Sequence, residues 1–193
     1  MSVLGYRARN HPQQVRAGGA RADVDDRATS WEDFRPLHSR FGFTVDAAAS
    51  PHNAKLSRFW TAEQDGLLQP WGGERVFCNP PYSHPNLHLW VAKAQAEHAL
   101  AVPPEVTVML LPANRTEQRW WQELVEPHRD RPGGLLHTEF LPGRLQFIAA
   151  GKPGIGPNER PPFGCCLLIW GHDVPPPAAV SCTQPELFGG EDA

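Results

Sequence analysis

Apolar side chains recur at helical spacing after Ser30, a residue type that favours helix N-termini: Trp31, Phe34, Leu37 and Phe41. This spacing predicts a helix in which Pro36 either produces a kink or marks the first turn. FGFTVD, at positions 41–46, alternates and contains strand-forming residues, so it predicts a strand. Residues 47–56 then favour a helix, and a second short strand is expected near Leu67.

The central part of the chain repeats an order of strand followed by helix. VFCN, at positions 76–79, is a short apolar strand stopped by two prolines, and Asn86 can cap a helix that runs to about Leu100. VTVMLLP, at positions 106–112, is typical of a strand covered on both faces, and Thr116 can cap the helix after it. The apolar faces expected for the two helices are Leu87, Trp90, Val91 and Ala94, and Trp120, Trp121, Leu124 and Val125.

Two late apolar segments complete the predicted sheet. Strands are expected at 144–148 and 164–170, and the loop between them is rich in proline and glycine without a helical pattern. These segments therefore predict an antiparallel C-terminal hairpin. The whole pattern predicts an α/β fold with a mostly parallel sheet and one reversed edge strand.

The two ends of the chain lack the pattern of a folded core. Residues 1–28 are rich in Arg, Gly, Ala and Asp and predict a flexible N-terminal arm. Residues 173–193 contain proline and acidic side chains and predict a flexible C-terminal tail. Between them, residues 29–172 are expected to form a single domain.

Charge and hydropathy narrow the possible function classes. The formal net charge of −3 excludes a surface that is positive throughout, so a DNA enzyme with this composition needs a local basic face. No apolar run approaches the length of a membrane span, and the N-terminus lacks the apolar stretch of a signal peptide. We therefore expect a soluble, cytoplasmic protein.

Cysteines and histidines give no indication of a metal site. The four cysteines have no C-x-x-C spacing, and the adjacent Cys165 and Cys166 lie in an apolar run where they are expected in the core. His84 and His88 lie four residues apart without a convincing third ligand. Neither a metal nor a structural disulfide is expected.

Asn79-Pro80-Pro81-Tyr82 follows an apolar strand directly. Ligands of α/β sheets bind at the carboxyl ends of the strands, and two consecutive prolines hold the backbone extended. The side-chain oxygen of Asn79 and the carbonyl of Pro80 could accept both hydrogens of an adenine amine, with Tyr82 stacked on a base flipped out of the duplex. The structural alternative is a proline-rich turn with a packed tyrosine.

Two carboxylates precede this tetrapeptide. Asp46 ends FGFTVD, and Asp65 lies 19 residues later, a spacing that fits one strand-helix-strand step. A carboxylate at a strand end can accept hydrogen bonds from ribose hydroxyls, and a second one can accept from the amino group of a cofactor's adenine. Either aspartate could instead be a surface cap or turn residue.

The stretch from about Thr29 to Trp170 resembles the phage-type DNA N-6-adenine methyltransferase family. Similar blocks occur in the family's order: FGFTVDAAASPHNAK, FWTAEQDGL, VFCNPPYS, WVAKA, VMLLPA, the Trp120-Trp121 pair, LPGRLQF and FGCCLLIW. Asn79 to Tyr82 matches the family's catalytic motif. The resemblance implies S-adenosylmethionine as methyl donor, adenine N6 in DNA as acceptor, and a Rossmann-like S-adenosylmethionine-dependent methyltransferase fold.

With this resemblance, the expected cofactor-binding residues are Asp46, Ala47, Ala48, Asp65, Gly66 and Asn79. The glycine-rich turn usual in such folds is missing or is replaced by the small residues at 47–49. Asp46 therefore ends either the strand of the glycine loop or the ribose-binding strand after it.

The basic face and the tail supply candidate contacts with partners. A positive rim for DNA could form from Arg115, Arg119, Arg144, Lys152 and Arg160, although each could be a solvated surface charge. Gln184-Pro185-Glu186-Leu187-Phe188 resembles the short peptides that dock on the bacterial sliding clamp.

Other functions fit parts of the same pattern. The tetrapeptide also occurs in amino methyltransferases that act on protein glutamine or RNA, but the glutamine enzymes carry an added N-terminal helical domain, and only the short arm precedes the fold here. A catalytically silent module that binds nucleic acid or a clamp would keep the α/β shell without binding the cofactor.

Overall fold

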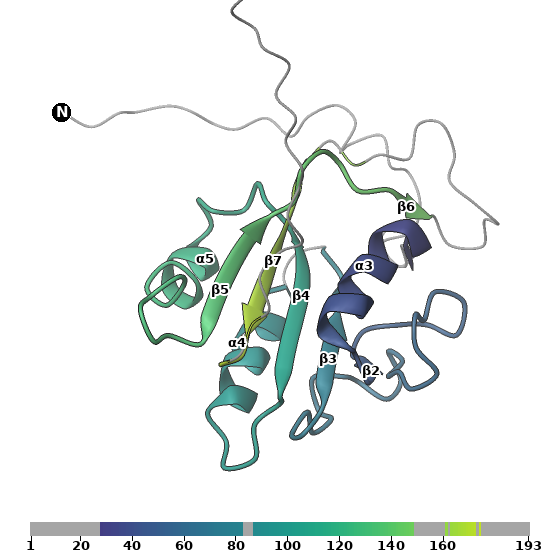
Figure 1. Cartoon of the computed structure of the whole chain (residues 1–193), viewed down its shortest axis with the longest axis horizontal. Coiled ribbons are helices and arrows are strands. Elements are labelled where there is room, and N and C mark those ends of the chain that lie inside the picture. The colour runs from purple at the N-terminus through teal and green to yellow at the C-terminus, as the bar shows by residue number, and fades with distance from the viewer. Residues whose placement is uncertain (1–27, 83–86, 149–160, 162, 173, 175–193) are drawn as a thin grey trace, which may run out of the picture.

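The computed structural model describes residues 28–82, 87–148, 161, 163–172 and 174. Helices and strands alternate along most of this part of the chain (Figure 1). In chain order they are β1 (Ala28–Thr29), α3 (Trp31–Phe41), β2 (Val45–Asp46), β3 (Arg75–Cys78), α4 (Leu87–His98), β4 (Val106–Pro112), α5 (Arg119–Leu124), β5 (Leu136–Phe140), β6 (Phe147–Ile148) and β7 (Cys165–Trp170).

A five-stranded sheet with the order β2-β3-β4-β7-β5 forms the centre of the α/β fold. β2 pairs with β3, and β3 with β4, in parallel, whereas β7 runs antiparallel to both β4 and β5. Four strands therefore share one direction and β7 alone is reversed. The prediction of a mostly parallel sheet is confirmed only in part, because β7 lies inside the sheet and not at its edge.

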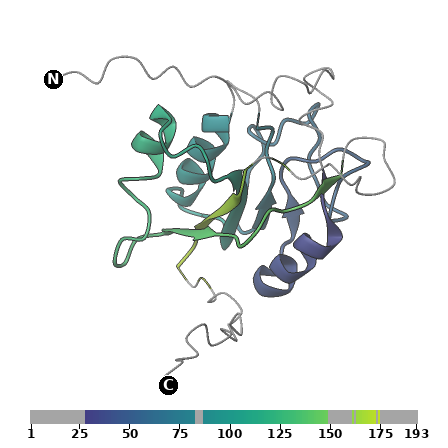
Figure 2. The ribbon, with the colours of Figure 1, turned by 90° about the horizontal axis from the view of Figure 1, so that it is seen from above.

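Helices cover both faces of this sheet (Figure 2). Alternate residues of β4 and β7 enter two separate cores, so Val108 and Ile169 pack on the side of α3 and Met109 and Leu168 on the side of α4 and α5. β4 and β7 are buried at every position, which explains why the continuous apolar runs in their sequences identify them correctly. Cys165 and Cys166 are buried and free, as expected for small core residues.

α3 begins and ends where side chains and backbone supply the caps. Ser30 Oγ accepts a hydrogen bond from the backbone nitrogen of Asp33 at 3.0 Å, which confirms the predicted N-cap. Gly42 ends the helix with φ of 60°, a conformation that side-chain-bearing residues rarely adopt. Because the helix includes Phe41, the predicted strand at 41–46 is reduced to Val45–Asp46.

The prediction that the strands at 144–148 and 164–170 pair with each other in a C-terminal hairpin is wrong. β6 pairs antiparallel with β1, in the register Ala28 to Ile148, while β5 supplies the second antiparallel neighbour of β7. β5 was missed because only its first residue, Leu136, is buried, so an edge strand of mixed polarity leaves no apolar alternation in the sequence.

Three local predictions between the strands are also wrong. Residues 47–56 form bends and turns, with Ala54 bonded to the carbonyl of Ser50 around a proline, and no helix. The residues around Leu67 form a turn where a strand was expected. α5 begins at Arg119 with Gln118 at the N-cap position, so Thr116 does not cap it.

Several predictions concern segments outside the described residues. They are the arm at 1–27, the greater part of the tail at 175–193 with the clamp-like peptide, His84, Asn86, Lys152 and Arg160. None of the helices that the structure describes is long and apolar enough to cross a membrane.

Candidate functional site

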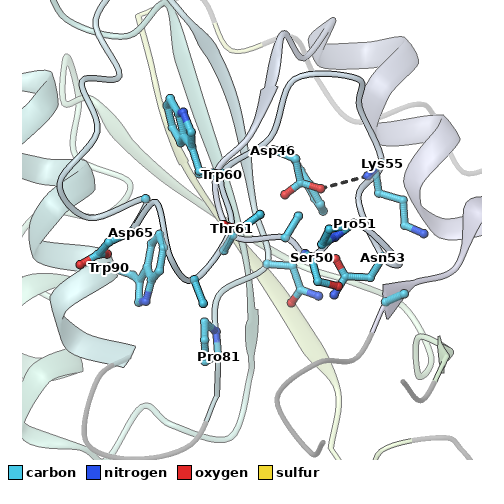
Figure 3. A pocket seen from close by; sticks show the side chains of 18 of the residues that line it. Asp46, Ser50, Pro51, Asn53, Lys55, Trp60, Thr61, Asp65, Pro81 and Trp90 are labelled. Atoms are coloured by element: carbon cyan, nitrogen blue, oxygen red, sulfur yellow. Dashed lines mark hydrogen bonds between the residues drawn. The ribbon is translucent and has the colours of Figure 1, made fainter. Parts of the chain in front are cut away.

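A cavity of about 690 Å³ opens at the carboxyl ends of β2 and β3 (Figure 3). Asp46 is the last residue of β2, and Asn79 follows the last residue of β3, so the parallel pairing of the two strands brings both side chains to one edge of the sheet. The principal polar residues that line the cavity are Asp46, Ser50, Asn53, Lys55, Thr61, Glu63, Asp65 and Asn79. A volume of this size is typical of small-molecule sites.

Asp46 is a buried carboxylate, with only 3% of its surface exposed. Oδ2 accepts a hydrogen bond from the backbone nitrogen of Lys55 at 3.1 Å, whereas Oδ1 is buried and has no hydrogen-bond partner among the described residues. Burial raises the pKa of Asp46 to about 6, against the smaller lowering effects of the backbone amides of Lys55 and Ala48 and of the Lys55 charge. A hydroxyl group entering the cavity would give Oδ1 the donor that it lacks.

The loop after β2 returns alongside the strand. The backbone nitrogen of Asp46 donates to Arg58, and that of Trp60 donates to Asp46, so Phe59 forms a parallel bridge on the outer side of β2. Ala47 donates to the carbonyl of Phe77 on the inner side. Small residues of this loop, Ala47, Ala48 and Ala49, therefore line one wall of the cavity. They stand where a glycine-rich turn is usual in such folds and where this sequence has none.

The Asp65-Gly66 turn forms the opposite wall, beside Trp90 (Figure 3). Asp65 adopts φ of 52° and its Oδ1 accepts a hydrogen bond from the backbone of Leu67 at 3.0 Å, so part of its acceptor capacity stabilises the turn. Gly66 lies so close to the Ala47 loop that an added Cβ would be 2.1 Å from the carbonyl oxygen of Ala47. This contact requires glycine and joins the two walls.

Only part of the tetrapeptide faces the cavity. Asn79 and Pro81 line it, whereas Pro80 is buried outside its lining. The Tyr82 hydroxyl donates to the carbonyl of Leu110 at 3.0 Å, and its ring makes edge contacts with Phe147 and Phe163. Burial raises the pKa of this hydroxyl well above its ordinary value, so it remains a neutral donor.

Thr29 is a site residue that the sequence did not reveal. It lines the cavity from β1, is buried, and its Oγ1 accepts a hydrogen bond from Nδ2 of Asn79 at 3.3 Å. The bond holds the amide nitrogen of Asn79, which orients the side-chain oxygen of the same group. No sequence signal pointed to Thr29, because the strand that carries it has two residues and pairs with the equally short β6.

Further lining residues belong to blocks that the sequence analysis had already singled out. Asn53 and Lys55 lie in FGFTVDAAASPHNAK, Trp60 and Thr61 in FWTAEQDGL, and Trp90 in WVAKA. The blocks therefore pointed to the right part of the chain. Which side chains face the cavity depends on turns that apolar periodicity does not encode.

The described candidate DNA-binding arginines do not all lie together. Arg115 and Arg119 border a second hollow of about 630 Å³ next to Tyr82, where Arg119 forms an ion pair with Glu123. Arg144 is exposed in the loop before β6. Within the described part of the chain, no cluster of His, Cys, Asp or Glu is arranged to hold a metal ion.

Comparison with known proteins agrees with these features. A model of the family "DNA N-6-adenine-methyltransferase (Dam)" matches residues 19–182. A protein of Escherichia phage T1 named "DNA N-6-adenine-methyltransferase" is 33% identical in an alignment 166 residues long that covers 80% of this chain and 64% of that protein. A protein of the same name from Haemophilus phage HP1 (strain HP1c1) is 39% identical over 67 residues, 34% of this chain and 39% of that protein.

The matched part of the chain thus spans less than two thirds of the length of each relative. The family match, by contrast, extends over most of the chain and includes every residue that lines the cavity. The chain belongs to the DNA N-6-adenine-methyltransferase (Dam) family.

Proposed function

We propose that this protein transfers a methyl group from S-adenosylmethionine to the exocyclic N6 amino group of adenine in DNA. One observation carries the proposal: Asp46 and Asn79 end neighbouring parallel strands and line the same cavity. A buried carboxylate suited to a nucleoside and an amide suited to an adenine amine thereby lie in one site. The family to which the chain belongs supports the same reaction.

The cavity wall around Asp46 fits the methyl donor. Oδ1 of Asp46 is a buried acceptor without a partner among the described residues, and the hydroxyl and ammonium groups of S-adenosylmethionine are donors that it can accept from. The close contact between Gly66 and the Ala47 loop keeps bulky side chains away from this wall. Bound here, the donor would supply an electrophilic methyl group on sulfur, and Asp46, Ala47, Ala48, Asp65, Gly66 and Asn79 would hold it.

Asn79 is the residue that we assign to the adenine amine. The lone pair of this amine is delocalised into the ring, so the nitrogen needs hydrogen-bond acceptors more than a strong base. The side-chain oxygen of Asn79 can accept one amino hydrogen and thereby raise the electron density on nitrogen. Thr29 supports this role because it accepts the hydrogen bond from Nδ2 of Asn79.

Pro80 and Tyr82 complete the proposed acceptor site. We assign the carbonyl of Pro80 to the second amino hydrogen, which requires that the tetrapeptide move when DNA binds, because Pro80 lies outside the cavity lining. Tyr82 is half-buried and its ring is held by the bond to Leu110, so its remaining exposed surface can stack on an extruded base. Flipping the base costs a few kcal/mol, which such stacking offsets.

The strand order supports a Rossmann-like arrangement. In doubly wound sheets with the order 3-2-1-4, the strand of the glycine loop lies between the ribose-binding strand and the fourth strand. β2 occupies this position, because the Phe59 bridge lies on its outer side and β3 on its inner side. We therefore assign Asp46 to the strand of the glycine loop, with 47–49 in place of the glycines.

A direct test is to incubate the protein with labelled S-adenosylmethionine and unmethylated DNA and to identify the product nucleoside by mass spectrometry. We expect N6-methyladenine, reduced at least 100-fold by Asn79→Ala because the amine loses its acceptor. Arg131→Gln, an exposed substitution outside the cavity, should alter the rate far less. Methylcytosine, or transfer to protein glutamine or RNA but not to DNA, would overturn the substrate assignment.

Affinity for the cofactor distinguishes an enzyme from a catalytically silent binding module. Calorimetry with S-adenosylhomocysteine should show one site per chain. If DNA binds but S-adenosylhomocysteine does not, the chain is a nucleic-acid module and the proposal fails.

A further inference from the structure

A cationic and aromatic cluster lies next to the cavity and is formed by Trp31, Arg35 and Lys55. Lys55 Nζ lies 4.7 Å from the centre of the Trp31 ring, and the Arg35 guanidinium carbon lies 5.9 Å from it. Trp31 is 47% exposed, although its ring also contacts the buried Phe34 edge-on at 5.7 Å. The ring is therefore anchored on Phe34 and remains about half exposed beside the two cations.

Arg35 and Lys55 lie outside the ion pairs of the described residues, although the buried Asp46 carboxylate attracts the Lys55 charge from farther away. Neither Arg35 nor Lys55 forms an ion pair within the described residues, whereas Arg40, Arg58 and Lys93 each pair with a glutamate. In a chain with a net charge of −3, two neighbouring cations without an ion-pair partner among the described residues are a local feature of the surface. It marks a place where an anion from outside can bind.

The cluster is continuous with the wall of the cavity. Lys55 lines the cavity, and Figure 3 shows its side chain turned away from the carboxylate of Asp46. Only the backbone nitrogen of Lys55 bonds to Asp46, so the ammonium group is available to a ligand. Trp31 begins α3 two residues after Thr29, which lines the same cavity and holds Asn79.

We propose that Trp31, Arg35 and Lys55 bind a nucleotide that flanks the target adenine in the methylated DNA strand. The two cations contact its phosphates, and the exposed part of the Trp31 ring packs against its base or sugar. Aromatic rings combined with cations are the usual platform for an unpaired nucleic-acid strand, because every base has a face that can stack. This inference rests on the proposed function and names the surface by which the substrate strand enters the cavity.

The alternative ligand of Lys55 is the carboxylate of the methyl donor. Trp31 and Arg35 argue for the DNA strand, since neither of them lines the cavity and an aromatic ring adds nothing to a carboxylate site. If Lys55 binds the methyl donor, its substitution should weaken the binding of S-adenosylhomocysteine. If it binds the DNA strand, the same substitution should weaken DNA binding, and the two affinities can be measured separately.

The test measures binding of a labelled, unmethylated duplex by fluorescence anisotropy with S-adenosylhomocysteine present, at pH 8, where Asp46 is ionised. Trp31→Ala should weaken DNA binding about tenfold, and Trp31→Tyr should restore most of the affinity by keeping a stacking ring. Lys55→Gln and Arg35→Gln should each reduce the slope of log affinity against log salt by about one. Phe140→Ala and Arg131→Gln, at the opposite edge of the sheet, are matched controls and should change neither quantity.

Each contrary outcome has a distinct meaning. If Lys55→Gln lowers the affinity for S-adenosylhomocysteine and leaves DNA binding intact, Lys55 serves the donor and the inference is wrong. Equal losses in Trp31→Ala and in the controls, with Trp31→Tyr no better, would also overturn it. Methyl transfer by the wild-type protein is measured in parallel, so that its absence defeats the proposed function independently of the DNA-binding results.

Discussion

Ionisation of the Asp46 carboxyl group is less favourable in the folded chain than in the unfolded one, because the group is buried. Burial raises its pKa from 3.8 to about 6, although Oδ2 accepts a hydrogen bond from the backbone of Lys55. Because the folded-state value is the higher one, folding favours the protonated form. This contribution to stability is complete below about pH 3.8 and is lost as the pH rises through about 6.

Asp46→Asn should therefore stabilise the protein at pH 8. The pKa shift corresponds to about 3 kcal/mol there, and burial of the amide NH₂ without a partner offsets about 1 kcal/mol, leaving a gain of about 1–2 kcal/mol. Urea unfolding at pH 8 and pH 5 measures it, and the gain should shrink at the lower pH. A variant less stable than the wild-type protein at pH 8 would show that the carboxylate is stabilised by the fold.

Thr29 acts on Asn79 by position. Thr29→Val keeps the shape of the side chain but removes the oxygen that accepts the hydrogen bond from Nδ2 of Asn79. We expect kcat for methyl transfer to fall about tenfold, as is typical when the orientation of a reacting group is lost. Thr29→Ser should retain most of the rate, and the affinity for S-adenosylhomocysteine should not change in either variant. A fall in affinity without a change in kcat would assign Thr29 to donor binding.

At the scale of elements, strands buried on both faces could be predicted and short edge strands could not. β4 and β7 consist of continuous apolar residues, and β3 ends at the tetrapeptide, so their sequences identify them. β1 and β6 contain two residues each and exist only because they pair with each other across more than 100 positions. Such pairing is a tertiary property that no local pattern records.

The same distinction applies to the candidate site. Asp46 and Asn79 were predictable because Asp46 ends one predicted strand and Asn79 follows the apolar core of the next, and parallel strands bring their carboxyl ends together. Thr29 and Lys55 could not be assigned, since one depends on β1 and the other on turns within 47–58. The packing of Tyr82 against Phe147 and Phe163 likewise depends on tertiary structure.

The turn at Asp65-Gly66 makes the cavity sensitive to a single methyl group. Gly66→Ala places Cβ 2.1 Å from the carbonyl oxygen of Ala47, so the backbone must shift. We expect a loss of about 1–3 kcal/mol in the free energy of unfolding, as for other overpacking substitutions, and a weaker affinity for S-adenosylhomocysteine.

Gly164→Ala provides the matched control for this substitution. Its added Cβ meets nothing closer than 3.9 Å, so both quantities should stay near their wild-type values. Thermal unfolding and calorimetry measure the two effects. Equal behaviour of the two variants would mean that the turn and the Ala47 loop are not in contact in solution.

For the whole molecule, the net charge of −3 limits how DNA can be bound. Cations outside the described ion pairs are local, as at Arg35 and Lys55, while Arg119 is paired with Glu123. The proposed function therefore requires binding energy from a small contact with the flipped base and its neighbours more than from a long phosphate track. The sheet fits this arrangement because it places Asp46 and Asn79 at one edge, between helices on both faces.

The central claim is that the cavity holds the methyl donor through Asp46, beside Asn79. Calorimetric titration of S-adenosylhomocysteine into the wild-type protein and Asp46→Asn, between pH 5 and pH 8, tests it most directly. We predict one site per chain, an affinity that declines in the wild-type protein as the pH falls through about 6, and a loss of at least tenfold in the variant at pH 8. Equal affinity in the two proteins at every pH would contradict the account.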